Sequence, residues 1–209
     1  MLGPIAPATQ ILLIANVGIF ILQIATGNQI VLPFALWPLE TGGVYEPNAG
    51  VGFAPWQLVT YSFLHGGLAH LFFNMLALYM FGSELERLFG RKRYVTYYFV
   101  CVVTAAVAQL LVTASMGGPP YPTVGASGGV FGLLLAFGLY FPHRQIMLIF
   151  PPIPMPAWLF VTLYGILELY LGITGTQAGI AHFAHLGGML GGWLMLQYWR
   201  GRGPFGRRR

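Results

Sequence analysis

Ser127 and four of the five histidines stand in a largely apolar sequence at positions that could support nucleophilic catalysis. Ser127 opens the run "SGGVFGLLLAFG", and His185 lies in "AHFAHLGGMLGGW". A serine hydroxyl becomes a nucleophile when a nearby imidazole accepts its proton, so this pair is the minimum for acyl-transfer chemistry. His70 and Asn74, in "HLFFN", are four residues apart and would share one helix face, where both can donate hydrogen bonds.

The same histidines are compatible with two other kinds of membrane protein. His182 and His185 are three residues apart and could share a metal ion, as in a metal-dependent hydrolase, although the HExxH motif of zinc hydrolases is absent. Intramembrane histidines also relay protons in transporters, but the sequence has no inverted repeat to match that class. The serine hydrolase is therefore the favoured interpretation, with no metal and no cofactor.

The composition indicates which elements must position these residues. The chain of 209 residues is 56% hydrophobic and only 7% charged, with a mean hydropathy of +0.70, which is typical of an integral membrane protein. A membrane-spanning helix needs about 20 apolar residues. The sequence predicts an all-α polytopic membrane protein, one domain over 1–209 with an outer loop at 28–55 and six helices at about 9–27, 68–88, 94–115, 127–141, 156–172 and 179–199.

The basic residues orient this arrangement and argue against a nucleic-acid partner. Every Lys and Arg falls in one of three places: between the second and third stretches, between the fourth and fifth, or after the sixth. With six crossings these places lie on one side, which the positive-inside rule makes cytoplasmic. Both termini are then cytoplasmic, and the loop 28–55 is outside. The basic residues are Arg87, Arg91, Lys92, Arg93, Arg144, Arg200, Arg202, Arg207, Arg208 and Arg209.

Counting along the helices predicts that the polar residues share one depth. Ser127 is 14 residues before Phe141, and His185 is 14 residues before Trp199. Each therefore lies about 21 Å above the cytoplasmic end of its helix. His70 and Asn74 lie at about 22 Å and 16 Å by the same count.

The residues around this layer suggest an aqueous cavity and limit the choice of a third catalytic group. The segment "MGGPPYPTVGA" before Ser127 is too rich in Gly and Pro to be helical. Irregular backbone at that depth implies a water-filled cavity open to the outside. The sequence has no Asp, and Glu168 is the only Glu near this layer. We therefore expect a Ser/His dyad rather than a triad that includes Glu168.

Glycines at four-residue spacing predict which helices meet. Gly128 and Gly132 follow Ser127, and after His185 come the pairs Gly187 with Gly191 and Gly188 with Gly192. Small residues at this spacing let helix backbones approach closely in lipid. Contact along these glycines would bring Ser127 and His185 within hydrogen-bonding reach.

Three motifs together resemble the rhomboid intramembrane serine proteases. They are "HGGLAHLFFN" at 65–74, "GASG" at 125–128 and "AHLGGMLGG" at 184–192, within a chain that resembles the minimal six-helix bacterial core of that family. The resemblance implies that Ser127 is the nucleophile. It makes His185 the general base, in preference to His182, because His185 is followed by the glycine motif. It makes His70, Asn74 and the backbone N–H of Ser127 the groups that stabilise the oxyanion, with His65, Gly125, Gly128, Gly188 and Gly192 as supporting residues.

Two positions depart from the family pattern or leave their role open. Gln57 follows Trp56 where the family often has Arg, so the loop-anchoring role of that pair is open. Glu86 resembles a position that braces either the turn between the second and third helices or the base of the fold, and a solvated charge is an equal alternative.

The resemblance also implies the setting of the reaction. The partners are the lipid bilayer and transmembrane protein substrates, which must unwind locally at small or helix-breaking residues. The fifth helix with "GITGTQAG" at 172–179 is the expected moving element. The expected location is the plasma membrane of a bacterium or archaeon, with the active site open to the outer side.

Overall fold

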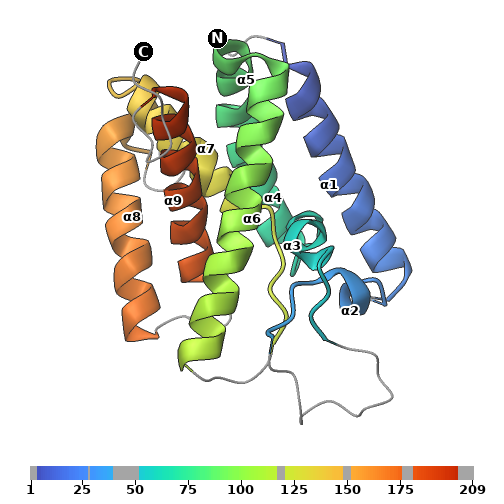
Figure 1. Cartoon of the computed structure of the whole chain (residues 1–209). Coiled ribbons are helices and arrows are strands. Elements are labelled where there is room, and N and C mark those ends of the chain that lie inside the picture. The colour runs from blue at the N-terminus through green and yellow to red at the C-terminus, as the bar shows by residue number, and fades with distance from the viewer. Residues whose placement is uncertain are drawn as a thin grey trace.

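The described residues form a bundle of helices with one short pair of antiparallel strands (Figure 1). The computed structural model describes residues 4–27, 29–39, 52–116, 121–147, 152–175 and 181–201. A 3-10 turn, η1 (Tyr61–Phe63), precedes α4, and a π-helical turn, η2 (Leu78–Gly82), joins α4 to α5. The helices are α1 (Pro7–Ala25), α2 (Val31–Phe34), α3 (Gln57–Thr60), α4 (Leu68–Ala77), α5 (Ser83–Phe89), α6 (Arg91–Met116), α7 (Ser127–Tyr140), α8 (Ala157–Thr174) and α9 (His182–Trp199).

The six predicted stretches are all helical, but they do not all have the character of membrane spans. Among the described residues, four helical segments are long and apolar enough to cross a membrane: Pro7–Ala25, Leu68–Phe89, Arg91–Ser115 and Ala157–Thr174. Helix α7 has 14 residues, which is about 21 Å against a hydrocarbon layer of about 30 Å. Helix α9 has 18 residues, but its histidines and glycines lower its hydropathy.

The structure contains several short elements that the sequence analysis did not predict. Strands β1 (Gln145–Met147) and β2 (Pro154–Pro156) pair antiparallel between α7 and α8. Helices α2 and α3 occupy parts of the chain that were expected to be loop. Elements of three or four residues are too short to produce a periodic pattern, so the sequence does not reveal them. Of the predicted outer loop at 28–55, residues 28 and 40–51 lie outside the described residues.

The centre of the bundle is built from α6, α7 and α9, with α1 and α8 at opposite edges (Figure 1). The predicted contact between α7 and α9 along their glycines is confirmed. A Cβ on Gly188 would overlap the backbone carbonyl of Gly128, so the two helices touch there without side chains. Gly132 and Gly192 both pack against the Cys101 side chain of α6, which fills the remaining space as a buried apolar residue.

Glu86 is buried and caps the first helix. Its carboxylate accepts hydrogen bonds from the backbone N–H groups of Ala8 (2.9 Å) and Thr9 (2.8 Å), and from the Thr9 hydroxyl (2.9 Å). These are first-turn donors of α1, which have no partner within the helix, and a negative charge there is favourable. Glu86 therefore braces the base of the fold, and the alternative of a solvated charge is wrong.

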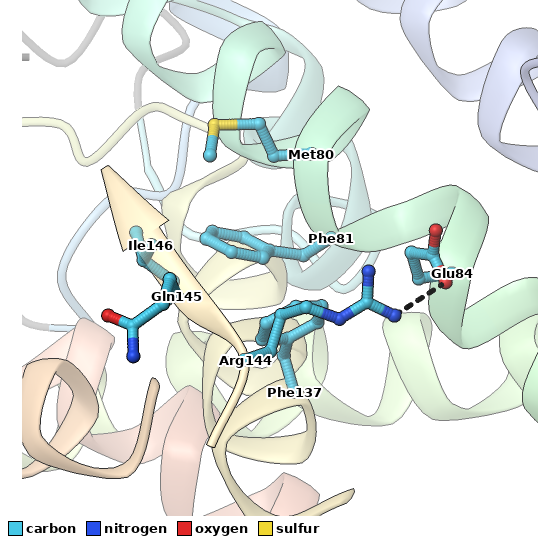
Figure 2. Close-up of a pocket in the computed structure, with 7 residues that line it drawn as sticks. All are labelled: Met80, Phe81, Glu84, Phe137, Arg144, Gln145 and Ile146. Atoms are coloured by element: carbon cyan, nitrogen blue, oxygen red, sulfur yellow. Dashed lines mark ion pairs between the residues drawn. The ribbon is translucent and has the colours of Figure 1, made fainter. Parts of the chain in front are cut away.

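A pocket of about 110 Å³ lies where α7 ends and β1 begins (Figure 2). Arg144 reaches across it to Glu84, with 3.8 Å between the guanidinium nitrogen and the carboxylate oxygen. Phe81 and Phe137 form its apolar wall, with ring centroids 5.0 Å apart. Ser127 opens α7, so this pocket is at the opposite end of that helix from the candidate nucleophile.

Candidate active site

Ser127 and His185 meet as the sequence predicts. The Ser127 hydroxyl Oγ lies 2.8 Å from the His185 ring nitrogen Nε2, although the residues are 58 positions apart. Ser127 is the first residue of α7, and His185 is in the first turn of α9. Figure 1 shows that the chain rises alongside α6 before α7 begins, so the start of α7 lies within the bundle. Residue counting from the ends of the two helices predicted that these side chains would lie level with each other, and the contact agrees with that prediction.

The non-helical segment before Ser127 is held by backbone hydrogen bonds. Leu36 and Thr123 exchange two of them, at 3.0 and 2.9 Å, and the Gly125 N–H donates to the Tyr61 carbonyl at 2.9 Å. Polar backbone groups away from water need such partners, because each unpaired group is costly in a low-dielectric surrounding. The segments around α2 and η1 thus fix the position of Ser127.

The imidazole of His185 is fixed by an aromatic ring that the sequence analysis did not identify. Phe131 stacks on it with ring centroids 4.2 Å apart and an angle of 5° between the planes. Phe131 is four residues after Ser127, one helical turn along α7, so the same face of α7 presents both the hydroxyl and the stacking ring to His185. The spacing of four residues between Ser127 and Phe131 was the feature of the sequence that could have indicated this contact.

His70 lies beside Ser127, and its hydrogen bond assigns its tautomer. Its Nδ1 accepts a hydrogen bond from the Gly66 N–H at 3.3 Å, so the neutral ring carries its proton on Nε2. A Cβ at Gly125 would lie 2.8 Å from His70 Nε2 and 3.6 Å from Ser127 Oγ. Gly125 also has a φ of +128°, so glycine is required there for both space and backbone conformation.

Asn74 is buried one turn further along α4. Its side-chain Nδ2 donates to the His70 backbone carbonyl at 2.9 Å, which is a bond within its own helix. His70 and Asn74 therefore share a face, as predicted. Of the two side chains, His70 is the one whose Nε2 lies beside the Cβ position of Gly125, next to Ser127.

His65 is fully buried and connects α1 to the site. The Gln23 side chain donates to the His65 carbonyl at 2.8 Å and accepts from its N–H at 3.2 Å. The rings of His65 and His70 are 5.2 Å apart between centroids. Burial, together with the nearby His70, lowers the pKa of His65 to about 4, so this ring is neutral at pH 7.

The first-loop residues Trp56 and Gln57 anchor the chain around α2. The Trp56 indole donates to the Pro33 carbonyl at 2.8 Å. Gln57 is buried, donates to the Gly52 carbonyl at 2.9 Å and accepts from the Trp37 N–H at 3.2 Å. Both hydrogen bonds need a neutral side chain with a donor and an acceptor, which Gln provides and Arg does not. Gln57 therefore anchors the chain around α2 through its neutral amide.

Glu168 is joined to the Ser/His pair, which differs from the expected dyad. One carboxylate oxygen, Oε2, lies 2.9 Å from His185 Nδ1 and 2.7 Å from His182 Nδ1. All three side chains are buried. They also offer one ligand atom each within 4.8 Å of one another, so a metal ion is a geometric possibility. Counting depth selected Glu168, but sequence cannot show that α8 turns this residue toward α9.

The expected moving element lies within the described residues only as far as Gly175. Residues 176–180, which include most of "GTQAG", lie outside the described residues. The described part of the segment ends at Gly175, where α8 is terminated by a left-handed glycine with a φ of +65°. Glycine is favoured at this position because it adopts the left-handed conformation without a steric penalty.

Comparison with known proteins identifies one family. The family model described as the Rhomboid domain matches residues 53–201, which include every candidate site residue. The chain is 33% identical over 139 residues to the rhomboid protease GluP of Bacillus subtilis, covering 66% of this chain and 24% of that protein. It is 32% identical over 178 residues to RHOMBOID-like protein 4 of Arabidopsis thaliana, covering 85% and 42% respectively.

A third relative extends the match over nearly the whole chain. The rhomboid protease GlpG of Yersinia pestis is 28% identical over 200 residues, which is 94% of this chain and 63% of that protein. The chain thus spans less than two thirds of the length of each of these three relatives.

Proposed function

The chain belongs to the rhomboid family, and on that premise we propose that it is a serine endopeptidase that hydrolyses peptide bonds in or near the transmembrane segments of other proteins. The observation that carries the proposal is the contact of 2.8 Å between Ser127 Oγ and His185 Nε2, in a chain with four helical segments that are apolar enough to cross a membrane. A polar pair in such surroundings is costly unless it is functional or structurally paired.

The proposed chemistry is acyl transfer. His185 Nε2 accepts the proton as Ser127 Oγ attacks the substrate carbonyl, and it returns that proton to the departing amine. Water then hydrolyses the acyl-enzyme through the same pair. Stacking on Phe131 keeps the imidazole from rotating away between the two steps.

The negative charge on the carbonyl oxygen needs hydrogen-bond donors. The Nε2–H of His70 lies beside Ser127, and the N–H of Ser127 belongs to the first turn of α7, where helix N–H groups are unpaired and the helix dipole is positive. The Asn74 amide has two N–H groups, of which one bonds the His70 carbonyl. We assign the second to the oxyanion. Donors fixed in advance at low dielectric are the largest contribution in this chemistry.

The membrane arrangement is also part of the proposal. Six crossings would use α1, the continuous helix 68–89, α6, α7, α8 and α9, with a water-filled cavity leading from the outer side to Ser127. The start of α1 and the end of α9 lie at one end of the bundle in Figure 1, together with the basic residues around α5 and α6. The positive-inside rule makes that end cytoplasmic, in the plasma membrane of a bacterium or archaeon.

The substrate would be a membrane protein that unwinds locally. An intact transmembrane helix keeps its carbonyls in internal hydrogen bonds, so the scissile bond must lie where small or helix-breaking residues weaken the helix. The half-exposed position of Ser127 beside buried His185 is compatible with access from one side.

Cleavage of a transmembrane model substrate in detergent tests this function. Ser127→Ala and His185→Ala should each abolish cleavage, whereas His182→Ala should keep a measurable fraction, because His182 touches Glu168 and not Ser127. The same assay is run with and without a strong chelator, since Glu168, His182 and His185 could hold a metal ion. Activity that chelation removes and zinc restores would favour the metal-dependent hydrolase, and normal cleavage by His185→Ala would remove the assigned base.

A further inference from the structure

Glu168 makes two hydrogen bonds that determine which ring nitrogens of His182 and His185 carry a proton. Its Oε2 lies 2.7 Å from Nδ1 of His182 and 2.9 Å from Nδ1 of His185. A carboxylate can only accept hydrogen bonds, so each Nδ1 must be the donor. The neutral His185 ring then has no proton on Nε2, which is the nitrogen that faces Ser127 Oγ at 2.8 Å.

We propose that Glu168 is a positioning residue for the reaction, so that Ser127, His185 and Glu168 work as a triad. This inference rests on the proposed function. Glu168 holds the proton of His185 on Nδ1, which leaves Nε2 able to accept the Ser127 proton. It also supplies a negative charge next to the imidazolium that forms during attack, and such a charge is more effective at low dielectric than in water.

His182 completes the surroundings of the carboxylate. A buried carboxylate is costly unless its oxygens accept hydrogen bonds, and Oε2 accepts two from rings that approach at right angles, with an angle of 88° between their planes. His182 thus orients Glu168 without contacting Ser127. Its loss should weaken the positioning of Glu168 and leave the pair of Ser127 and His185 in place.

The alternative role for Glu168 is to hold α8 in the bundle. Only three of the 18 residues of α8 are buried in the protein: Ala157, Val161 and Glu168. Glu168 is the only charged residue of this helix, and its bonds lead to α9. If the role of Glu168 is purely structural, its loss should lower the melting temperature and impair kcat and KM together. If Glu168 positions His185, its loss should lower kcat more than it changes KM or the melting temperature.

Val161→Ala provides a matched control for that alternative. The Val161 side chain packs against Gly138 of α7, where a Cβ on the glycine would lie 2.7 Å from a methyl group of Val161. Removing two methyl groups there weakens the docking of α8 without touching His185. The two variants are compared at assay temperatures that lie equally far below their own melting temperatures.

The experiment compares kcat, KM and melting temperature for Glu168→Gln, Val161→Ala and the unaltered protein. We expect Glu168→Gln to lower kcat by about 10²-fold to 10⁴-fold with KM little changed, the upper figure being the loss when a triad carboxylate becomes its amide. Val161→Ala should keep kcat. Near-normal kcat in Glu168→Gln, or an equal loss in Val161→Ala, would overturn the inference.

A second measurement reads the His185 tautomer in the unaltered protein, and a variant serves only to assign the signal. In a sample with ¹⁵N-labelled histidine, the His185 ring is identified as the signal that His185→Ala removes. The inference requires its neutral form to carry the proton on Nδ1, and a proton on Nε2 would contradict it. The proposed function is tested separately, by whether Ser127→Ala abolishes cleavage. The protease function and the positioning role of Glu168 can therefore fail independently.

Discussion

At the scale of single residues, the two candidate oxyanion donors are not equivalent. His70 has its Nδ1 occupied by the Gly66 N–H and its Nε2 beside the Cβ position of Gly125, next to Ser127. Asn74 uses one amide N–H within its own helix. A hydrogen-bond donor stabilises the transition state more when its position is already fixed in the free enzyme. We therefore expect His70 to contribute more to oxyanion stabilisation than Asn74.

We therefore predict that His70→Ala lowers kcat by about 10²-fold to 10³-fold, with substrate affinity nearly intact. Asn74→Ala should lower kcat less. The double variant should be less impaired than the product of the two single effects, because both groups act on one oxygen. The measurements are kcat, KM and melting temperature on the three variants. Unchanged kcat with reduced stability would mean that these residues only tie α4 to its neighbours.

At the scale of elements, the site depends on how closely α7 and α9 approach. Gly188 contacts the backbone of Gly128, one residue after Ser127, and lies three residues after His185. Any separation of the helices at this point would lengthen the hydrogen bond of 2.8 Å between Ser127 and His185. The glycines thus act on catalysis through backbone packing, which polar side chains alone could not ensure in lipid.

Gly188→Ala should reduce stability and activity together. The added methyl group would overlap the Gly128 carbonyl, and overpacking of this kind costs about 1 to 3 kcal/mol. Gly18→Ala in α1 is the matched control, because nothing lies within 4 Å of its Cβ position. Thermal unfolding and the cleavage assay are measured on both. Equal behaviour of the two variants would show that the approach of α7 and α9 is looser than described.

At the scale of the whole molecule, the orientation in the membrane decides from which side a substrate reaches Ser127. Trp56 is exposed beside α3, near the site, and Lys92 is exposed at the start of α6, at the opposite end of the bundle. The proposed topology puts the first outside and the second in the cytoplasm. Each position can be tested with a single cysteine, because the natural Cys101 is buried and can be replaced.

In a Cys101→Ala background, a membrane-impermeant maleimide applied to intact cells should label Trp56→Cys and spare Lys92→Cys. In lysed cells the maleimide should label both cysteines, which shows that each cysteine can react when the reagent reaches it. The reverse pattern in intact cells would place the site on the cytoplasmic side and contradict the orientation inferred from the basic residues.

The sequence predicted the larger elements of the molecule and the central pair of the site. Hydropathy located six helices, and counting residues from their basic ends put Ser127 and His185 at one depth. These features depend on regular helical geometry, which a linear pattern records. Hydropathy did not distinguish the short helix α7 from the four long apolar segments, because it records composition and not position in the bundle.

What the sequence did not predict depends on the rotation of one helix against another. Glu168 was found at the right depth but was not expected to bond His185, since its direction is set by the packing of α8. The cap that Glu86 provides for α1 joins residues about 77 positions apart, and no local signal links them. The stacking of Phe131 on His185 likewise required the placement of α9.

The central claim is that Ser127 is a nucleophile activated by His185. The most direct measurement is to treat the purified, unaltered protein with a fluorophosphonate and to locate the modified residue by mass spectrometry. We expect a covalent adduct on Ser127 that His185→Ala prevents, because the Ser127 hydroxyl, 2.8 Å from His185 Nε2 in the unaltered protein, then has no base. No adduct on Ser127, or the same rate of adduct formation in His185→Ala, would contradict it.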